Sequence, residues 1–412
     1  MPSPNLSRRG ATAPASPIRR LTPFADGARA RGVHVHHLNI GQPDLPTVAP
    51  MLAAYRAFDH RTVAYSPSQG FAEYREALAN YYNDPAIIRD QPAIAPDQIL
   101  VTVGGSEALL FTIAATCDVG DELLVVEPYY TNYRGFAHML GVAVKPVTTH
   151  ASEDFSLPPS RVEQAITAKT RALVIPSPGN PTGAVLSRDD LVALSDVCRR
   201  HGLFLIVDEV YREFVYGEDS GPGESVAASI LGIAAMHEHA VVIDSVSKRY
   251  SACGARVGNL VTRNPDVYAA CLKFAQARLS PPTVDQVAAL AALTTPRAIM
   301  REMVGEYRGR RDTLVAALRQ VPGISCPTPA GAFYLIADLP VADAEAFCIF
   351  LLNDFDLDGE TVMMAPASGF YATPGRGRNQ VRIAYVLASD KLERCVEILR
   401  AGLRAYETKT SR

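Results

Sequence analysis

A lysine stands in a polar stretch directly after an apolar run. The stretch SVSKRYSACGARVG covers residues 245–258. Two serines come just before Lys248, and an arginine follows it eight residues later. The preceding residues 240–244 have the length and β-branched content of a buried strand. A lysine just past such a strand lies where ligands bind in an open parallel sheet, outside the carboxyl ends of the strands. The alternative is a solvent-exposed loop lysine, and the rest of the chain has to decide between the two.

Two further polar segments follow predicted strands. Gly104-Gly105-Ser106-Glu107 comes after the predicted strand 98–103 and opens a predicted helix. Its backbone N–H groups and its hydroxyl could cradle a phosphate, although a turn that caps the helix is the structural alternative. The segment PGNPTG at 178–183 follows the predicted strand 171–175 and by itself indicates only a turn.

A carboxylate and a tyrosine follow the next predicted strand, 203–207. They belong to Asp208-Glu209-Val210-Tyr211, and the aspartate alone could be a helix N-cap. Together, the segments bring a phosphate cradle, a carboxylate, a tyrosine, an asparagine, a lysine and an arginine to one edge of one sheet. A cofactor with a phosphate, a basic ring nitrogen, a phenolic oxygen and an aldehyde would use all of these groups. Pyridoxal phosphate is such a cofactor.

The segments between these motifs predict the elements that position them. Strand-like runs alternate with helical segments, which favours a mainly parallel sheet covered on both faces. The predicted strands are 98–103, 123–126, 143–148, 171–175, 203–207, 240–243 and 257–261, with helices at 106–116 and 188–200. After about residue 296, long helices (298–320, 341–354, 390–405) surround short strands (333–337, 381–384). The predicted fold class is therefore α/β, with a large domain built on a mainly parallel seven-stranded sheet sandwiched by helices and a smaller α+β domain.

The composition is that of an ordinary globular protein. Of the 412 residues 48% are hydrophobic and 20% charged, and the formal net charge is −3. The absence of a basic tract predicts no nucleic-acid partner, and no apolar run approaches the ~20 residues that span a bilayer. The seven cysteines are scattered without a CxxC pair, so we expect no disulfide framework and no metal site. This pattern is typical of a reducing compartment, and we expect a cytoplasmic protein.

The order and spacing of the motifs resemble the class I aminotransferases, which are fold type I pyridoxal-phosphate enzymes. The resemblance rests on Gly-Gly-Ser, Asn-Pro-Thr-Gly, Asp-x-x-Tyr and Ser-x-Ser-Lys with an arginine eight residues after the lysine. It extends from LNIGQPD at 38–44 to VRIAYV at 381–386, which is nearly the whole chain. It implies transfer of an amino group from an L-amino acid to a 2-oxo acid by a ping-pong mechanism, in a homodimer with shared active sites.

The resemblance implies a role for each motif residue. Lys248 resembles the lysine that forms a Schiff base with the cofactor and then moves the proton at the substrate's α-carbon. Asp208 resembles the partner of the pyridine nitrogen, whereas Tyr211 and Asn180 resemble the pair that hydrogen-bonds the phenolate oxygen. The implied phosphate cup comprises Gly105, Ser106, Glu107 through its backbone N–H, Ser245, Ser247 and Arg256.

Four further residues match positions around the cofactor and the substrate. Tyr130 falls where the family stacks an aromatic ring on the pyridine, and the other tyrosines of EPYYTNY are the alternatives as core or rim aromatics. Tyr65 matches a tyrosine that reaches the neighbouring subunit's phosphate. Arg382 matches the arginine that clamps the α-carboxylate, and Gly41 matches a glycine whose backbone approaches the substrate. The resemblance also predicts cis peptide bonds at Glu127–Pro128 and Asn180–Pro181.

The substrate's side chain is left open. Some aspartate-specific relatives carry a lysine where Ser106 stands, and it binds a distal carboxylate. Arg19 and Arg20 are only candidates for a second carboxylate, and the loop 363–375 is another candidate for side-chain selection. The sequence therefore leaves open whether dicarboxylic substrates are preferred.

Four segments and two alternative functions complete the expectations. The segments are a flexible arm 1–16, a segment 17–44 that packs with the small domain, a large cofactor-binding domain 45–296 and a small C-terminal domain 297–412. The first alternative is a lyase, cyclase or oxidase acting on an amino acid such as arginine, because the same scaffold supports these reactions. The second is a DNA-binding regulator, which is rejected because residues 1–37 are too few for a winged helix with a linker.

Overall fold

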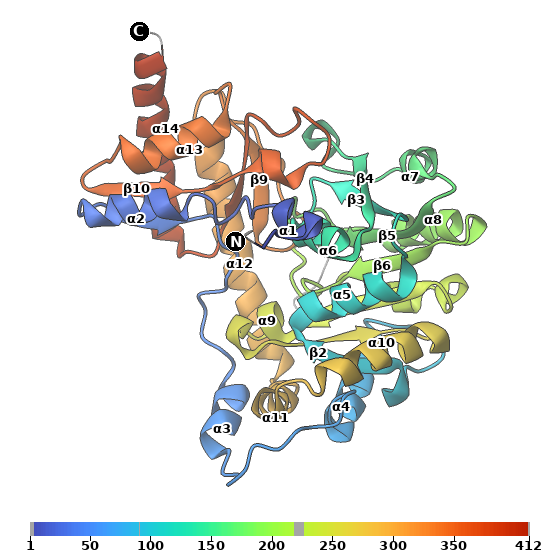
Figure 1. The fold of residues 1–412 in the computed structure, drawn as a ribbon. Coiled ribbons are helices and arrows are strands. Elements are labelled where there is room, and N and C mark those ends of the chain that lie inside the picture. The colour runs from blue at the N-terminus through green and yellow to red at the C-terminus, as the bar shows by residue number, and fades with distance from the viewer. Residues whose placement is uncertain (1–3, 90, 218–225, 411–412) are drawn as a thin grey trace.

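A seven-stranded sheet forms the centre of the computed structural model, which describes residues 4–89, 91–217 and 226–410 (Figure 1). The strand order is β2-β8-β7-β6-β5-β3-β4. Strand β8 runs antiparallel to both of its neighbours, and the other pairs are parallel. The predicted mainly parallel sheet is therefore confirmed. Its strands are β2 (Ile99–Val103), β3 (Glu122–Glu127), β4 (Ala143–Thr148), β5 (Thr170–Pro176), β6 (Phe204–Asp208), β7 (Ala240–Ser245) and β8 (Val257–Val261).

Helices cover both faces of this sheet, as its nearly continuous apolar strands require. Within β5, Ala172 and Val174 face one helical layer, whereas Leu173 and Ile175 face the other. The first layer holds α5 (Gly104–Thr116), α6 (Asn132–Leu140) and α10 (Pro265–Arg278). The second holds α4 (Ala72–Tyr82), α7 (Pro159–Ala165), α8 (Arg188–Arg200) and α11 (Thr283–Ala292).

A second core lies around the C-terminal elements. The long helix α12 (Arg297–Arg319) runs from the large sheet toward them (Figure 1). They comprise a three-stranded sheet of order β11-β12-β9 with α13 and α14. Their bounds are β9 (Tyr334–Asp338), α13 (Ala344–Asn353), β10 (Glu360–Met363), β11 (Ala365–Pro366), β12 (Gln380–Ala384) and α14 (Ser389–Thr410). Helix α13 begins later than predicted because the Asp343 side chain accepts from the backbone N–H groups of Glu345 and Ala346 and so caps the helix there.

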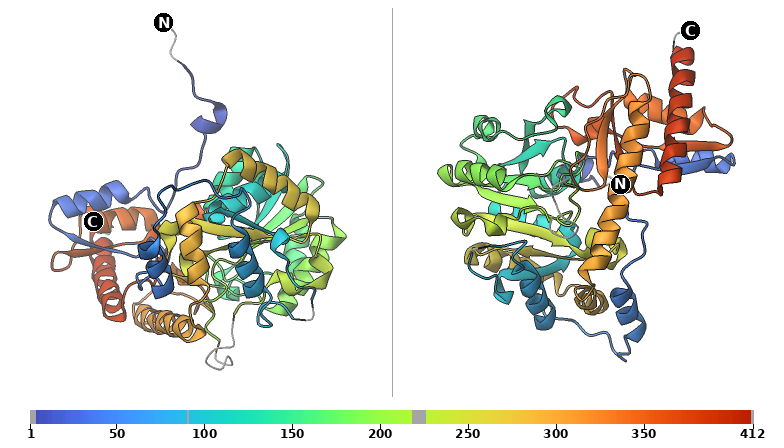
Figure 2. Two further views of the ribbon diagram at one scale, coloured as in Figure 1. Left: turned by 90° about the horizontal axis from the view of Figure 1, so that it is seen from below. Right: turned by 180° about the vertical axis from the view of Figure 1, so that it is seen from behind.

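The N-terminal segment packs on these C-terminal elements. Strand β1 (His34–His37) pairs in parallel with β10, and α2 (Thr22–Ala30) packs on α13. Both views in Figure 2 show α2 beside the C-terminal elements. Before it, α1 (Arg8–Ala11) lies against α6, where Arg9 donates to the carbonyl of Met139. These contacts agree with the packing expected of residues 17–44, whereas the domain boundaries stay a prediction.

The cis peptide bonds test one expectation from the sequence. The peptide bonds Glu127–Pro128 and Asn180–Pro181 are cis, as predicted, and Ser177–Pro178 is a third cis bond that was not predicted.

The short helices α3 (Ala49–Ala57) and α9 (Val246–Arg249) complete the α-helices of the described chain. Within the described residues, no helix is both long and apolar enough to cross a bilayer.

Candidate active site

Lys248 points into the molecule. It lies on α9, whose first turn is capped by the Ser245 hydroxyl at the end of β7. Its Nζ donates to the carbonyl of Gly41 at 2.6 Å and lies 5.8 Å from the centre of the Phe333 ring. The side chain is half-buried between segments more than 80 residues apart in sequence. An exposed loop lysine does not fit this environment.

The N-terminus of α5 and Arg256 form a close-packed concavity. Gly104 has φ of +71°, and a Cβ at this position would lie 2.4 Å from the Arg256 guanidinium. Arg256 itself has φ of 54°, and its Nη1 donates to the carbonyl of Cys253 at 2.9 Å. Gly258 on β8 permits the approach of α5, since a Cβ there would lie 2.5 Å from the Gly105 nitrogen. The arrangement aims a guanidinium at the positive end of a helix, which suits a bound anion.

The hydroxyl groups predicted for this concavity are partly engaged. Ser245 Oγ lies 2.7 Å from Ser247 Oγ and donates to the carbonyl of Val257 at 2.9 Å. The carboxylate of Glu107 accepts from the Val103 N–H and from Arg278. Glu107 is thus directed away from an anion, in agreement with the backbone-only role expected for it.

Asp208 carries a buried carboxylate at the end of β6. It accepts from the Tyr133 hydroxyl at 2.8 Å and from the Val210 N–H at 3.4 Å. No cation pairs with it among the residues that the structure describes. Burial is the largest of the effects that raise the pKa of Asp208, to about 6. A cationic ligand group facing this carboxylate would reverse that shift.

Tyr211 and Gly41 meet at Tyr334. The hydroxyls of Tyr211 and Tyr334 lie 2.8 Å apart, and both rings are buried. Burial raises the pKa of Tyr211 well above its ordinary value. A Cβ on Gly41 would lie 1.7 Å from the Tyr334 hydroxyl oxygen, so only glycine fits this arrangement. Tyr334 was not singled out from the sequence, because nothing in the strand around it distinguishes a site tyrosine from a core tyrosine.

Arg382 is held between two aromatic rings. Its guanidinium carbon lies 4.5 Å from the centre of the Tyr334 ring and 5.1 Å from that of Phe370. It donates to the side-chain oxygen of Asn180 at 3.1 Å and to the carbonyl of Asn39 at 2.5 Å. Its Nε has no hydrogen-bond partner among the described residues, although Arg382 is only 1% exposed. Burial lowers the pKa of Arg382, because the guanidinium is desolvated and no carboxylate of the described residues pairs with it.

Tyr130 belongs to this group, whereas Tyr65 stands apart. Tyr130 packs edge-on against Tyr133 at 5.5 Å, and its hydroxyl accepts from the Asn132 side chain. Burial raises the pKa of Tyr130 above its ordinary value. Tyr65 is 79% exposed on the single chain, and no hydrogen bond of its side chain is present in the described residues.

The structure thus brings most predicted residues to one region at the carboxyl ends of the strands. Those linked by the contacts above are Gly41, Gly105, Tyr130, Asn180, Asp208, Tyr211, Ser245, Ser247, Lys248, Arg256 and Arg382. Ser106 sits at the same helix N-terminus, between Gly105 and Glu107. Of the arginine candidates, Arg20 pairs with Glu345 at 2.6 Å and donates to Ser368. Tyr133 was considered only as a core or rim aromatic, yet its hydroxyl binds Asp208, a contact without a sequence signal.

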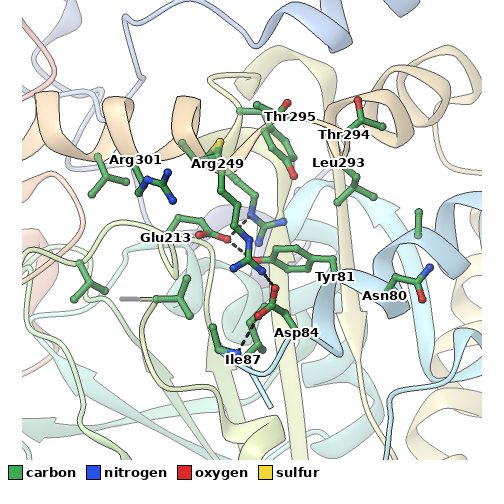
Figure 3. Close-up of a pocket in the computed structure, with 18 of the residues that line it drawn as sticks. Asn80, Tyr81, Asp84, Ile87, Glu213, Arg249, Leu293, Thr294, Thr295 and Arg301 are labelled. Atoms are coloured by element: carbon green, nitrogen blue, oxygen red, sulfur yellow. Dashed lines mark hydrogen bonds and ion pairs between the residues drawn. The ribbon is translucent and has the colours of Figure 1, made fainter. Parts of the chain in front are cut away.

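A separate cavity of about 750 Å³ is lined in part by Arg249 and Tyr250, the two residues after Lys248 (Figure 3). Its wall includes Tyr81, Glu213 and Arg249, and Arg249 forms a buried ion pair with Asp244. All the predicted site residues are described, and none of them lines this cavity. The large cavity and the Lys248 region are therefore different places, and the convergent polar groups mark the latter as the candidate active site.

Comparison with known proteins agrees with this geometry. Residues 33–399 match the family model described as aminotransferase class I and II. The chain belongs to this aminotransferase family. The match includes every predicted site residue, from Gly41 to Arg382. The predicted family is therefore confirmed.

Individual aminotransferases match nearly end to end. The aspartate aminotransferase of Bacillus subtilis is 32% identical over 95% of this chain and 97% of its own length. The aromatic-amino-acid aminotransferase 2 of Thermococcus litoralis is 31% identical over 94% and 96%. The solved aspartate aminotransferase of Thermus thermophilus with maleate superimposes with a TM-score of 0.84 at 31% identity, covering 97% of this chain and all of that one. The fold and the amino-group transfer are thereby confirmed, and the lyase, cyclase or oxidase alternative gains no support.

Proposed function

We propose that this aminotransferase holds pyridoxal phosphate at Lys248 and uses it to exchange the amino group of an L-amino acid with a 2-oxo acid. When bound, the cofactor supplies an aldehyde for the amino group and an electron sink for the α-carbon. The observation that carries the proposal is the convergence of Lys248, Asp208 and Arg256 on one region.

The residues present fit this cofactor. Asp208 is a buried carboxylate without a cationic partner in the described chain, which suits the protonated nitrogen of a pyridine ring. Arg256 and the N-terminus of α5 suit its phosphate, through charge-assisted hydrogen bonds and backbone N–H groups. Gly105, Ser106, Glu107 through its N–H, Ser245 and Ser247 complete the proposed phosphate cup. Tyr130 would cover the ring face, and Tyr211 and Asn180 would donate to the ring's phenolate oxygen.

Lys248 then has two tasks at one nitrogen. Its Nζ first holds the cofactor and, once released, takes the proton from the substrate's α-carbon and returns it. Its position beside the Gly41 carbonyl and over the Phe333 ring keeps the amine away from bulk water. Only the neutral form of an amine can accept the proton.

Arg382 is the proposed clamp for the α-carboxylate of every substrate. Within the described part of the chain its Nε lacks a hydrogen-bond partner, and two aromatic rings pack close to the guanidinium. A planar fork of this kind suits both oxygens of a carboxylate. The side chain of the substrate is selected elsewhere, and Ser106 does not supply the cation that a distal carboxylate needs. The engagement of Arg20 with Glu345 gives no support to that arginine as a second carboxylate binder.

A homodimer with shared sites is the proposed active unit. Tyr65 and Leu279 are exposed apolar side chains of adjoining segments, since Ser68 donates to the carbonyl of Leu279 at 2.6 Å. A second subunit would cover them and would bring Tyr65 to its phosphate. The cysteines, all unpaired, support a reducing compartment such as the cytoplasm.

Two measurements test the proposal. Borohydride reduction of the purified protein followed by peptide mapping should place the pyridoxyl label on Lys248, and Lys248→Ala should lose both the label and turnover. Labelling of Lys273 or Lys391 instead would overturn the assignment. Single-turnover reactions with acidic, basic, aromatic and aliphatic amino acids, with identification of each 2-oxo product, would then define the substrate.

A further inference from the structure

The end of β3 holds a loop from the C-terminal part of the chain. Glu127, the last residue of β3, is completely buried. Its Oε2 accepts from the backbone N–H of Ala372 at 2.7 Å and from that of Thr373 at 3.0 Å. Two residues after Glu127, the Tyr129 N–H donates to the carbonyl of Phe370 at 2.9 Å. Three hydrogen bonds thus join this loop, residues 370–373, to the large sheet.

Glu127 is itself fixed by the neighbouring strand. Its Oε1 accepts from the Thr148 hydroxyl at 2.7 Å at the end of β4, and its carbonyl accepts from the Thr149 N–H at 2.8 Å. The three groups that contact the side-chain carboxylate, two backbone N–H groups and the Thr148 hydroxyl, all donate to it. The carboxylate is therefore a rigid anchor rather than a mobile surface charge.

The first residue of the anchored loop lies beside Arg382. Phe370 closes the short helix η6 (Ala367–Phe370) and is completely buried with its ring 5.1 Å from the Arg382 guanidinium. The opposite ring, Tyr334, comes from β9, next to β12 in the same sheet. One ring of the pair is therefore set by the sheet that carries Arg382, and the other depends on the loop that Glu127 holds.

We propose that Glu127 is a positioning residue for α-carboxylate binding, acting through Phe370 on the orientation of Arg382. This inference rests on the proposed role of Arg382 as the clamp. Without the carboxylate, the N–H groups of Ala372 and Thr373 lose their acceptor, and the loop loses two of its three hydrogen bonds to the large sheet. The Phe370 ring then no longer restricts the guanidinium, whose Nε has no hydrogen bond to any residue that the structure describes.

The expected kinetic signature is a selective rise in KM. The α-carboxylate is bound equally before and during the proton transfer, so a looser clamp weakens both states. Glu127→Ala should raise KM for every accepted amino acid by ~10-fold while kcat changes less than about threefold. The Ki of 3-phenylpropionate, a carboxylate without an amine, should rise by a similar factor. The absorption spectrum of the bound cofactor should not change.

Two more conservative substitutions of Glu127 distinguish a loss of positioning from a loss of folding. Glu127→Gln should remain near wild type, because its Oε1 can accept both N–H groups while its amide donates to a reoriented Thr148 hydroxyl. Glu127→Asp shortens the reach of the carboxylate and should also raise KM. This variant replaces Glu127→Ala in the test if Glu127→Ala does not fold. The matched control is Glu122→Ala at the other end of β3, where the carboxylate also accepts from a threonine hydroxyl, that of Thr167 at 2.6 Å. This control should leave KM unchanged.

A double-mutant cycle tests the route through Phe370. Phe370→Leu should raise KM as Glu127→Ala does, and the combined variant should be little worse than either alone. Additive effects, an unchanged KM in Glu127→Ala and Glu127→Asp, or a loss confined to kcat would each overturn the inference. These results leave borohydride labelling of Lys248 untouched, so failure of the inference is distinct from failure of the proposed function.

Discussion

The guanidinium of Arg382 donates to the side-chain oxygen of Asn180 at 3.1 Å, although the two residues lie 202 positions apart in the sequence. Asn180 follows β5 of the seven-stranded sheet, whereas Arg382 lies on β12 of the three-stranded sheet. The proposed cofactor partner and the proposed substrate clamp are therefore in direct contact. A change in the packing of the two sheets should therefore affect cofactor binding and substrate binding together.

Replacement of Arg382 should affect all substrates alike. Arg382→Ala is expected to lower kcat/KM by a similar factor for every accepted amino acid, about 2–4 kcal/mol in transition-state terms. Arg382→Lys should recover only part of the loss, because an ammonium cannot reproduce the planar fork. The measurement is a set of specificity ratios for acidic, basic, aromatic and aliphatic amino acids. A loss confined to dicarboxylic substrates would make Arg382 a reader of the side chain instead.

Asp208→Asn should separate activity from stability. Turnover should fall strongly, because an amide cannot hold the proton on the pyridine nitrogen. In the cofactor-free protein the pKa of Asp208 is raised to about 6, above the ordinary ~3.9 of an unfolded chain. A raised pKa adds stability that is present below about pH 4 and lost as the pH rises through about 6.

The cofactor-free Asp208→Asn variant should therefore gain stability over wild type as the pH rises. The gain should be absent near pH 4 and reach about 2–3 kcal/mol near pH 8 by urea unfolding. The exposed control Asp59→Asn should show no such pH-dependent gain. Addition of pyridoxal phosphate should make the wild type the more stable of the two proteins, since only the carboxylate can pair with a pyridinium. A stability difference that does not vary with pH would contradict the burial argument.

Gly41→Ala should perturb the site by crowding. The new methyl group would meet the Tyr334 hydroxyl at 1.7 Å, so Tyr334 must move away from Tyr211 and Arg382. We expect kcat/KM to fall by ~10–100-fold and the protein to lose ~1–3 kcal/mol of stability, as for other overpacked sites. Gly135→Ala on α6, where a Cβ meets nothing within 4 Å, is the matched control and should be neutral or slightly stabilising. Equal behaviour of the two variants would exclude the crowding.

Mixed dimers should show from which subunit Tyr65 acts. Lys248→Ala and Tyr65→Ala homodimers should each be impaired. If Tyr65 serves the neighbouring site, a mixed dimer regains one intact site, and random mixing restores about a quarter of the wild-type sites. If Tyr65 serves its own subunit, mixing restores nothing. Activity measured after unfolding and refolding the two variants together distinguishes these outcomes.

The large sheet and the order of its polar strand ends could be predicted from the sequence alone. The apolar runs after about residue 98 predicted each strand of the large sheet to within about two residues, because β-branched segments of this length are buried on both faces. Lys248, Asp208 and Asn180 were found because parallel strands bring their carboxyl ends to one edge. These features depend on short stretches of chain and on one rule of topology.

The side chains that surround these residues could not be predicted before the chain was folded. Tyr133 and Tyr334 read as ordinary core tyrosines, and their contacts with Asp208 and Arg382 arise when segments far apart in sequence pack together. The anchoring of the loop 370–373 by Glu127 likewise has no local signal, since a glutamate at a strand end looks like a surface residue until the loop is placed over it. The physical reason is that a polar group's role is set by the partner it meets after burial, and burial is a property of the whole fold.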